Sequence, residues 1–464
     1  MKRLFLFLCF LSISGLDQDA YLNAASSRPN IVLVMADDLG WGDIGYHGGE
    51  APTPNLDRVS AAGLRFNRFY AQPICTPTRT ALMTGRYPWR SGMASGVVLN
   101  HLSYGLPIDE VTLADVLKSA GYKNYLVGKW HLGHSQPAYL PTERGFDYHY
   151  GLYTAIDHFT HTWQGGHDWH RNRQPVYEEG YATDLLGDDA VRIIHEHDYD
   201  SGPMFLYHAM FAVHPWMQST EDYMAPFSDE ANEERRGLLG LVSAMDYQFG
   251  RMIDALKAEG QLDNTIVFFL SDNGGPVNHQ ASNGKLRGTK GTYYEGGVRV
   301  PAFAYWPGRI AAGETSEALA YVADLFATSA ALAGAELPQD RMIDGLDLSP
   351  VLFGQTDTSF RREIVFMLED SERLRRGAII HWPWKMRRTA LEGQHWVYEL
   401  FNLEIDPNEA GNAHRLGQLK PEIVSWLSAR LDMLAVDAPK AYWRPGDGNP
   451  PSGWQADAII GPDQ

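Results

Sequence analysis

One cysteine stands at a position where it could do chemistry. The chain has two cysteines, and Cys9 lies in an apolar N-terminal stretch that we expect to be removed, which leaves Cys75 alone. It opens the run Cys75-Thr76-Pro77-Thr78-Arg79-Thr80-Ala81-Leu82-Met83-Thr84-Gly85-Arg86. Pro77 suits the first position of a helix and Gly85 suits its end, so Cys75 is expected just before a helix N-terminus, where the dipole favours an anion. The segment predicts a nucleophile beside an anion site, with Arg79 one turn away; the alternative is an inert buried thiol.

Two polar pairs offer oxygen ligands for a metal ion. Asp37-Asp38 follows the apolar run Ile31 to Met35, and Asp272-Asn273 follows the apolar run Ile266 to Leu270. Three carboxylates and an amide are hard ligands, which suit calcium or magnesium better than zinc. Taken alone, Asp37-Asp38 could equally be a turn or capping pair. Together with the second pair and Cys75, it predicts a metal site.

The sequence segments that must position these residues have the patterns of buried parallel strands alternating with helices. Two further apolar runs, Tyr125 to Val127 and Met204 to Tyr207, lead towards Lys129-Trp130-His131 and towards His214. Helical spacing appears before Gly121 and again from Leu241 to Leu256 before Gly260. This alternation predicts a doubly wound α/β sheet, in which ligands bind beyond the carboxyl ends of the strands. Every polar cluster named so far lies at such an end.

The pattern changes after Gly354. Three apolar runs predict strands over Ile364–Leu368, Gly377–Lys385 and His395–Leu403, and a helix is expected from about Pro421 to Leu434. This favours a second, smaller unit with an antiparallel sheet and one helix. The expected organisation is a signal peptide over 1–25, a catalytic domain over 26–355, a C-terminal α+β subdomain over 356–437 and an irregular tail over 438–464.

Charge and the N-terminus limit the partners and the location. Lysine and arginine number 39 and aspartate and glutamate number 57, a net charge of −18. That excess argues against nucleic acid or an anionic membrane as a partner, so an anionic substrate needs a local basic pocket. Met1-Lys2-Arg3 precedes a short apolar run, as in a secretory signal, and no apolar stretch is long enough to span a membrane. Without internal disulfides, this favours an exported, periplasmic or secreted bacterial protein.

At this point the sequence resembles a known family. Cys-x-Pro-x-Arg, followed by Leu-Met-Thr-Gly-Arg, resembles the signature of the formylglycine-dependent type I sulfatases. Other blocks of that family recur in order, in the segments 30–38, 127–133, 270–275, 286–291 and 295–299. The resemblance is greatest to the arylsulfatase B (N-acetylgalactosamine-4-sulfatase) group and to bacterial carbohydrate sulfatases. It implies an alkaline-phosphatase-like sandwich: a large, mixed, mostly parallel sheet between helices, plus the small C-terminal sheet. Thr78 stands where serine is more usual, and Pro215 follows His214 directly.

The resemblance also implies residue roles. Cys75 would be oxidised to formylglycine (3-oxoalanine) by a formylglycine-generating or anaerobic sulfatase-maturating enzyme. Calcium would be bound by Asp37, Asp38, residue 75, Asp272 and Asn273. Asp272 would assist deprotonation of the attacking diol, Arg79 and Lys129 would hold the diol, and Lys290 would bind sulfate. His214 would protonate the leaving oxygen, and His131 would take the second diol proton.

A loop over 151–181 is rich in histidine and aromatic residues. A substrate-recognition role is favoured, with aromatic rings stacking on sugar faces and Asp157 or His161 binding hydroxyl groups. A second, transition-metal site is an open alternative, although no ligand spacing here is diagnostic. A solvated loop without a role is another alternative.

The predicted function is hydrolysis of sulfate esters on a sugar, with the sulfated sugar as the substrate. Two other functions remain open. One is hydrolysis of phosphate or phosphonate esters, which related folds carry out. The other is a protein that binds sulfated glycans and whose Cys75 is never oxidised.

Overall fold

A sheet of ten strands forms the centre of the structure, a computed structural model that describes residues 28–369, 374–390, 396–436, 439 and 442. The spatial order of the strands is β13-β2-β12-β11-β1-β10-β4-β5-β8-β9. The five central strands, from β11 to β5, pair in parallel, and most outer strands pair antiparallel. The bounds are β1 (Asn30–Ala36), β2 (Leu64–Phe66), β4 (Lys123–Lys129), β5 (Tyr148–Leu152), β8 (His170–Arg171), β9 (Gln174–Pro175), β10 (Met204–Ala209), β11 (Thr265–Ser271), β12 (Ala302–Tyr305) and β13 (Glu314–Ser316).

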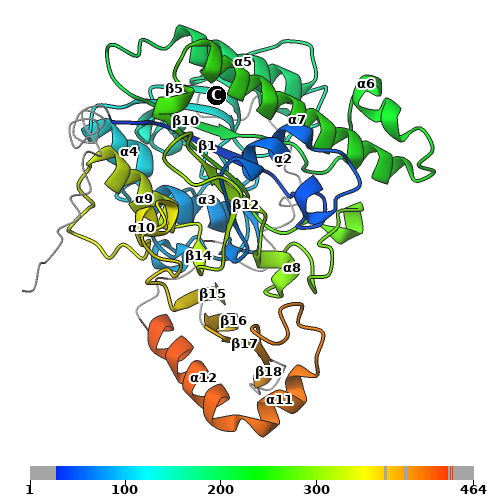
Figure 1. Ribbon diagram of the computed structural model, residues 1–464, viewed down its shortest axis with the longest axis vertical. Helices are drawn as coiled ribbons and strands as arrows, with labels where there is room; N and C mark the ends of the chain where they lie inside the picture. The colour runs from blue at the N-terminus through cyan, green and yellow to red at the C-terminus, as the bar shows by residue number, and fades with distance from the viewer. Residues whose placement is uncertain (1–27, 370–373, 391–395, 437–438, 440–441, 443–464) are drawn as a thin grey trace, which may run out of the picture.

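Helices cover both faces of this sheet (Figure 1). Alternate residues of β1 enter two separate apolar clusters: Ile31 and Leu33 face one, and Val32 and Val34 face the other. This double burial is why the strand reads as one continuous apolar run. The predicted α/β sandwich with a large mixed sheet is confirmed. The first cluster includes α3 (Cys75–Thr84), α4 (Leu113–Ser119) and α9 (Asp324–Ala333); the second includes α2 (Pro54–Ala61), α5 (Ala182–Glu196) and α7 (Glu233–Ala258).

Shorter elements complete the large part of the fold. They are β3 (Phe69–Tyr70), β6 (Thr162–Trp163), β7 (Gly166–His167), β14 (Ala320–Tyr321), α6 (Glu221–Met224), α8 (Glu295–Val298) and α10 (Ser349–Leu352). In the described residues, no helix has both the length and the apolar character needed to cross a membrane.

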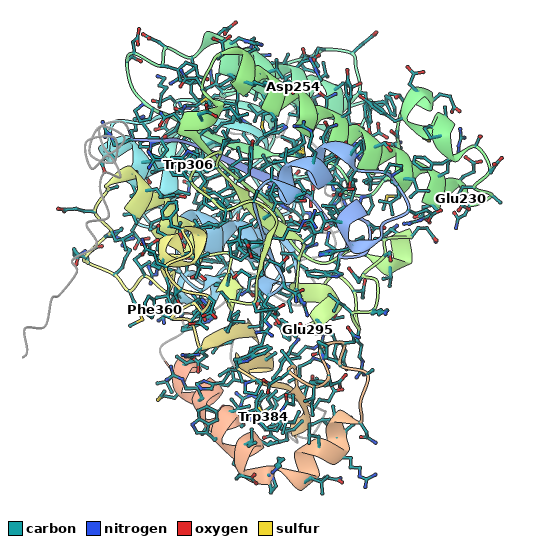
Figure 2. All side chains as sticks on the ribbon, in the orientation of Figure 1. Glu230, Asp254, Glu295, Trp306, Phe360 and Trp384 are labelled. Carbon is teal, nitrogen blue, oxygen red and sulfur yellow. The ribbon has the colours of Figure 1, made fainter. Side chains whose placement is uncertain are left out.

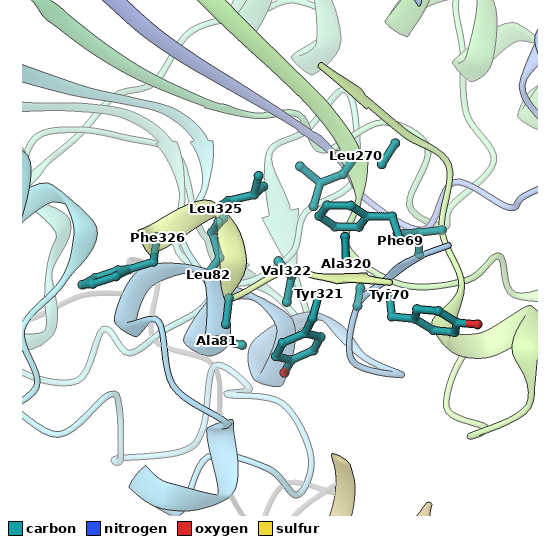
Figure 3. Close-up of a cluster of buried hydrophobic side chains, with 14 of the residues drawn as sticks. Phe69, Tyr70, Ala81, Leu82, Leu270, Ala320, Tyr321, Val322, Leu325 and Phe326 are labelled. Atoms are coloured by element: carbon teal, nitrogen blue, oxygen red, sulfur yellow. The ribbon is translucent and has the colours of Figure 1, made fainter. Parts of the chain in front are cut away.

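Helix α3 is buried over its whole length. All ten of its residues are inaccessible, and Ala81 and Leu82 pack beside Leu325 and Phe326 of α9 (Figure 3). The helix begins at Cys75 itself, which corrects the expectation that Cys75 precedes it. Its end at Gly85 is as predicted, because this residue takes the left-handed conformation with φ of 67°. A helix held so firmly fixes its first residue in space.

The C-terminal part is a four-stranded antiparallel sheet in the order β15-β16-β17-β18. The predicted single strand over 377–385 is wrong: a turn at Trp382-Pro383 divides it, and His381 pairs with Trp384 across a hairpin. The predicted helix is α12, and a short α11 precedes it. The bounds are β15 (Glu363–Glu369), β16 (Leu374–His381), β17 (Trp384–Ala390), β18 (Trp396–Asn402), α11 (Ala413–Leu419) and α12 (Pro421–Ala435).

A buried ion-pair network joins this sheet to the large part. Lys385 of β17 is fully buried, and its Nζ lies 2.7 Å from Glu295 Oε1 and 2.9 Å from Glu409 Oε1. Glu295 begins α8 and accepts a hydrogen bond of 2.9 Å from the hydroxyl of Tyr70. Figure 2 labels Glu295 at the junction and Trp384 within the C-terminal part. The C-terminal sheet is therefore anchored to the segment that follows Lys290.

Two predicted segments fall at the ends of the chain. The signal peptide expected over 1–25 lies outside the described residues. So does most of the irregular tail expected over 438–464. Of that tail, Tyr442 stacks on Tyr104 with ring centroids 5.7 Å apart, and its backbone N–H donates to the carbonyl of Gly92 at 3.1 Å.

Candidate active site

The predicted ligand residues meet where β1 and β11 end and α3 begins. Asp37, Asp38, Cys75 and Asp272 each offer an atom, and these atoms lie within 4.8 Å of one another. All four side chains are buried, at 0 to 1% exposure. The strands bring the carboxylates together because β1 and β11 are parallel neighbours whose carboxyl ends lie side by side.

The donor set fits a hard cation. The backbone N–H of Asp38 donates to Asp272 Oδ1 at 3.1 Å, and Asn273 Nδ2 donates to Asp38 Oδ1 at 2.7 Å. Asn273 Oδ1 is buried and has no hydrogen-bond partner among the described residues, so it is free to bind a metal ion. Burial beside Asp37 and Asp38 raises the pKa of the Asp272 carboxyl. A bound cation would remove that penalty, and oxygen ligands of this kind suit calcium or magnesium.

Two fully buried cations face the carboxylates. Lys129, at the end of β4, donates from Nζ to Asp37 Oδ2 at 2.7 Å. Arg79, one turn into α3, donates from Nη2 to Asp272 Oδ2 at 3.0 Å, and Nη2 lies 3.5 Å from Asp37 Oδ2. Burial alone would raise the pKa of Asp37, but the charges of Lys129 and Arg79 hold it well below its usual range. The pairing keeps Asp37 ionised.

Cys75 is protonated at neutral pH in this environment. Its thiol donates to Asp37 Oδ1 at an Sγ–O distance of 3.6 Å, and its side chain is 1% exposed. Burial, together with the charge of Asp272, raises the pKa of the thiol above its ordinary value. Because the thiolate is the nucleophilic form of cysteine, an unmodified Cys75 is a poor nucleophile here. The dipole of the helix N-terminus would lower the pKa of the thiol, but the effect of burial is larger.

Both predicted histidines reach the site. His131 follows β4 in the left-handed conformation with φ of 61°, and its Nδ1 has no partner among the described residues. His214 Nε2 lies 3.8 Å from Asp38 Oδ2, while its Nδ1 donates to the carbonyl of Pro215. Burial and the charge of Lys129 lower the pKa of His214 to about 3. They also lower that of His131 well below its usual range, so both rings are neutral at pH 7.

Lys290 connects the buried residues to the surface. Its Nζ donates to Asp38 Oδ2 at 2.6 Å, and its side chain is 22% exposed, whereas those of Arg79 and Lys129 are 0% exposed. It lines an open cleft of about 710 Å³ together with Asp38 and His214. The other lining residues are Trp163, Pro215, Trp216, Met217, Gln218, Glu233, Glu234, Pro276, Asn278 and His279.

The two predicted substrate residues of the loop lie away from this lining. Asp157 accepts hydrogen bonds from the backbone of Phe159 and Thr160 and from Gln218 Nε2, the last at 2.8 Å. Asp157 therefore reaches the cleft through Gln218. His161 is 1% exposed and stacks on Trp169 with ring centroids 4.5 Å apart. Direct substrate binding by Asp157 and His161 stays a prediction.

Several contributors to the site could not be found from the sequence motifs. Trp163 and Trp216 meet edge to face at the cleft with ring centroids 4.4 Å apart, although Trp163 ends β6 and Trp216 lies in the segment after β10. Tyr207 of β10 accepts a hydrogen bond of 3.4 Å from Arg79 Nη1. The hydroxyl of Thr78 donates to the Asp272 carbonyl at 2.6 Å and so ties α3 to the end of β11. Only the apolar run of β10 hinted at Tyr207.

Family comparisons agree with this geometry. The profile of the Sulfatase family matches residues 29–335, and a profile described as N-sulphoglucosamine sulphohydrolase, C-terminal, matches residues 289–437. The first match covers more than half of the chain. This protein therefore belongs to the sulfatase family of enzymes, as the motif resemblance implied.

Individual relatives support the assignment. Arylsulfatase J of Mus musculus is 36% identical over 334 residues, a match that covers 70% of this chain and 56% of that protein. N-acetylgalactosamine-6-sulfatase of Mus musculus is 38% identical over 362 residues, covering 71% of this chain and 67% of that protein. The chain thus spans little more than half the length of the first of these relatives.

Solved structures share the whole fold. The crystal structure of Ps i-CgsB in complex with k-i-k-neocarrahexaose superposes with a TM-score of 0.83 at 30% identity, covering 91% of this chain and 96% of that one. Phosphonate monoester hydrolase of Agrobacterium radiobacter has a TM-score of 0.64 at 20% identity, covering 88% and 96%, and shows likeness of fold alone.

Proposed function

We propose that this protein hydrolyses sulfate esters of a carbohydrate, using calcium and a formylglycine made from Cys75. The observation that carries the proposal is the charge arrangement around position 75. Three buried carboxylates converge there with the sulfur, and Arg79, Lys129 and Lys290 each pair with one or more of them. The three cations balance the three carboxylates, so a bound divalent cation would leave the site positive and able to stabilise negative charge that develops in a transition state.

The calcium and the aldehyde each supply one part of the chemistry. When bound, calcium would draw charge from the sulfate oxygens, and formylglycine would offer an oxygen nucleophile in place of the thiol. Asp37, Asp38, Asp272 and Asn273 are the residues that would hold the metal. Burial raises the pKa of the Cys75 thiol, which makes the thiol a poor nucleophile and so supports the proposal that this position is oxidised before it reacts.

The cations of the chain divide the work between the buried site and the cleft. Arg79 and Lys129 are inaccessible, so they hold the side chain at position 75 and the carboxylates in place. Lys290 is the partly exposed cation, and its ammonium can contact a sulfate oxygen that enters from the cleft. Its charge compensates the ester group that every substrate shares.

His214 is positioned to supply a proton to the leaving oxygen. Its Nδ1 donates to the Pro215 carbonyl, so the neutral ring presents an unprotonated Nε2 near Asp38. An anionic ester bound beside the ring would favour the imidazolium form, which can then protonate a sugar alkoxide. His131, which follows Lys129 at the end of β4, is the second base that we assign to proton removal at position 75.

A carbohydrate substrate is supported by the cleft and by the relatives. Trp163 and Trp216 present aromatic faces and edges beside the polar Gln218 and Asn278, a combination that suits a sugar. The names of the relatives point the same way: one is an N-acetylgalactosamine-6-sulfatase, and one solved structure holds a neocarrahexaose. We retain Asp157 and His161 as supporting residues of this cleft.

A matched kinetic comparison tests the reaction class. Aryl sulfate, phosphate and phosphonate esters with the same leaving group should be compared by kcat/KM on protein made with a maturation enzyme. We expect the sulfate to be the best substrate. A higher kcat/KM on the phosphate or phosphonate ester would instead indicate a phosphate or phosphonate ester hydrolase. Binding of sulfated glycans without turnover would indicate a glycan-binding protein.

The location and the domain organisation complete the proposal. We propose export under the signal peptide of 1–25, to the periplasm or the medium of a bacterium, and oxidation of Cys75 by a sulfatase-maturating or formylglycine-generating enzyme. Residues 26–355 would form the catalytic domain and 356–437 the C-terminal subdomain. The anchoring of Lys385 to Glu295 supports a subdomain that is fixed to the site.

A further inference from the structure

A second cavity borders the residues next to Cys75 and Lys290. It has a volume of about 260 Å³ and is lined by Pro73, Ile74, Ala94, Gly96, Gly291, Thr292, Tyr293, Arg376 and Arg387. Ile74 directly precedes Cys75, and Gly291 directly follows Lys290. The N–H of Gly291 donates to the carbonyl of Pro73 at 2.8 Å. The segment that leads to Cys75 therefore contacts the segment that follows Lys290 in the wall of this cavity.

The remaining wall comes from the C-terminal sheet and carries two arginines. Ala378 of β16 lies opposite Arg387 of β17, and Arg376 is two residues before Ala378. Side chains two apart in a strand share a face, so Arg376 and Arg387 are diagonal neighbours on the face that lines the cavity.

The two arginines differ in how their charge is balanced. Arg387 forms an ion pair with Glu399, which lies opposite it on β18, and its guanidinium is 3.5 Å from the centroid of the Tyr294 ring. Arg376 is exposed and has no hydrogen-bond or ion-pair partner among the side chains that the structure describes. Arg287 also approaches Glu399, at 3.6 Å. Two arginines therefore share one carboxylate, and Arg376 adds a further positive charge to the described part of this wall.

This excess of positive charge contrasts with the rest of the molecule. The chain as a whole carries a net charge of −18, and the cleft that Lys290 lines also contains Glu233 and Glu234. Like charges on neighbouring strands destabilise a sheet unless an anion compensates them. A cation cluster kept beside the reacting residues in an acidic protein indicates that an anion binds there.

We propose that this cavity is a second anion-binding subsite, with Arg376 as its principal ligand. It takes a sulfate or carboxylate on a sugar unit next to the one that is desulfated. The inference rests on the proposed function and narrows it: the preferred substrate is an oligosaccharide or polysaccharide with anionic groups on neighbouring units. Glu233 and Glu234 in the cleft would repel a second anionic group, so we expect that group near Arg376 rather than in the cleft.

Equilibrium binding to the Cys75→Ala protein tests the subsite without turnover. The probes are three oligosaccharides of equal length: one with a single sulfate, one with sulfates on two neighbouring units, and one with a uronate beside the sulfated unit. Calorimetric titration should show tighter binding of a doubly charged oligosaccharide, by about tenfold for one added charge-assisted contact. The uronate probe distinguishes carboxylate from sulfate as the second group.

Variants locate the effect. Arg376→Gln should weaken binding of the doubly charged oligosaccharide by roughly 3- to 10-fold, as expected for a partly exposed ion pair, and leave the singly sulfated one within about twofold. Arg376→Lys should retain most of the affinity. Arg251→Gln, which removes a charge on α7 that pairs with Asp188 of α5, is the remote control and should change neither.

The outcomes separate the two proposals. Equal affinity for all three oligosaccharides, or the same loss for all of them in Arg376→Gln, would overturn the second subsite. Hydrolysis of a singly sulfated oligosaccharide by the matured protein would leave the proposed function intact in that case. Binding of none of the oligosaccharides would contradict both the subsite and the proposed carbohydrate substrate.

Discussion

The floor of the site and its rim differ in how they are held. The floor consists of Asp37, Asp38, Cys75, Arg79, Lys129 and Asp272, all of which are buried at the ends of strands or in α3. The rim consists of Trp163, Trp216, Gln218, Glu234 and His279, which come from β6, from the segments after β10 and β11, and from the start of α7. Trp216 is 48% exposed, whereas no floor side chain exceeds 1%. Under the proposed function, the floor would set the reaction, and the rim would select the molecule that presents the sulfate.

The largest effect should follow from loss of the metal at the floor. Asp38→Ala and Asp272→Ala should each lose bound calcium and about 10³-fold or more in kcat, because the ion is worth several kcal/mol to the transition state. Metal content and turnover are measured on the same samples. Chelation of the wild-type protein should have the same effect and calcium should reverse it. Either variant turning over at the wild-type rate after chelation would show that the metal site is misplaced.

The proton donor should separate one class of substrate from another. A sugar alkoxide needs a proton as the ester bond breaks, but a nitrophenolate leaves without one. His214→Ala should therefore lose roughly 10²- to 10⁴-fold in kcat/KM on a sulfated sugar, equivalent to about 3–5 kcal/mol, and far less on an aryl sulfate. Equal losses on the two esters would remove His214 as the acid.

Lys290→Ala is the matched comparison for that experiment. Under the proposed function, Lys290 would contact the sulfate group that both esters share, so its loss should lower kcat/KM on both esters by the same factor. The measurement is kcat/KM for the two variants on the two esters. A selective loss on the sugar ester in Lys290→Ala would place Lys290 on the rim rather than at the sulfate.

The stability of the calcium-free protein should depend more on the floor than on the rim. Lys129→Met leaves the buried charge of Asp37 without its closest partner, which typically costs about 3–5 kcal/mol in the free energy of unfolding. Lys290→Met should cost less, because water reaches the partly exposed position. Denaturant unfolding in chelator measures both, and equal costs would contradict the distinction between floor and rim.

The smallest effect is expected at the exposed aromatic edge. Trp216→Ala removes one half of the edge-to-face pair with Trp163, which is worth about 0.5–1.5 kcal/mol. Affinity for a sulfated oligosaccharide should fall by roughly 3- to 10-fold, while kcat/KM on an aryl sulfate stays within about twofold. A similar loss on the aryl sulfate would mean that Trp216 supports the floor.

The floor could be predicted from the sequence because the end of each buried strand is marked by a change from apolar to polar residues. Asp37-Asp38 and Asp272-Asn273 each follow an apolar run that is buried on both faces, and parallel neighbours must place such pairs together. Cys75 was found through its helix signals and through the family motif. The start of α3 was misjudged because Pro77 is tolerated at the third helical position as well as the first.

The rim and the C-terminal sheet could not be predicted in the same way. Trp163 and Trp216 are in contact, but they lie far apart in the sequence, and no periodic pattern predicts how the segments around them fold. His161 reads as a polar loop residue, yet it packs against Trp169 in the interior. The prediction of one strand over 377–385 is wrong because the turn at Trp382-Pro383 consists of apolar residues, so no polar residue marks it in the sequence. Arg376 and Arg387 are diagonal neighbours only because of that hairpin.

The mass of the peptide that contains Cys75, measured beside the turnover of the same sample, tests the central claim most directly. Protein made with a maturation enzyme should carry an aldehyde at position 75 and hydrolyse sulfate esters. Protein made without that enzyme should carry the thiol and show no turnover, as should Cys75→Ala. Full activity with an intact thiol, or in Cys75→Ala, would contradict the account.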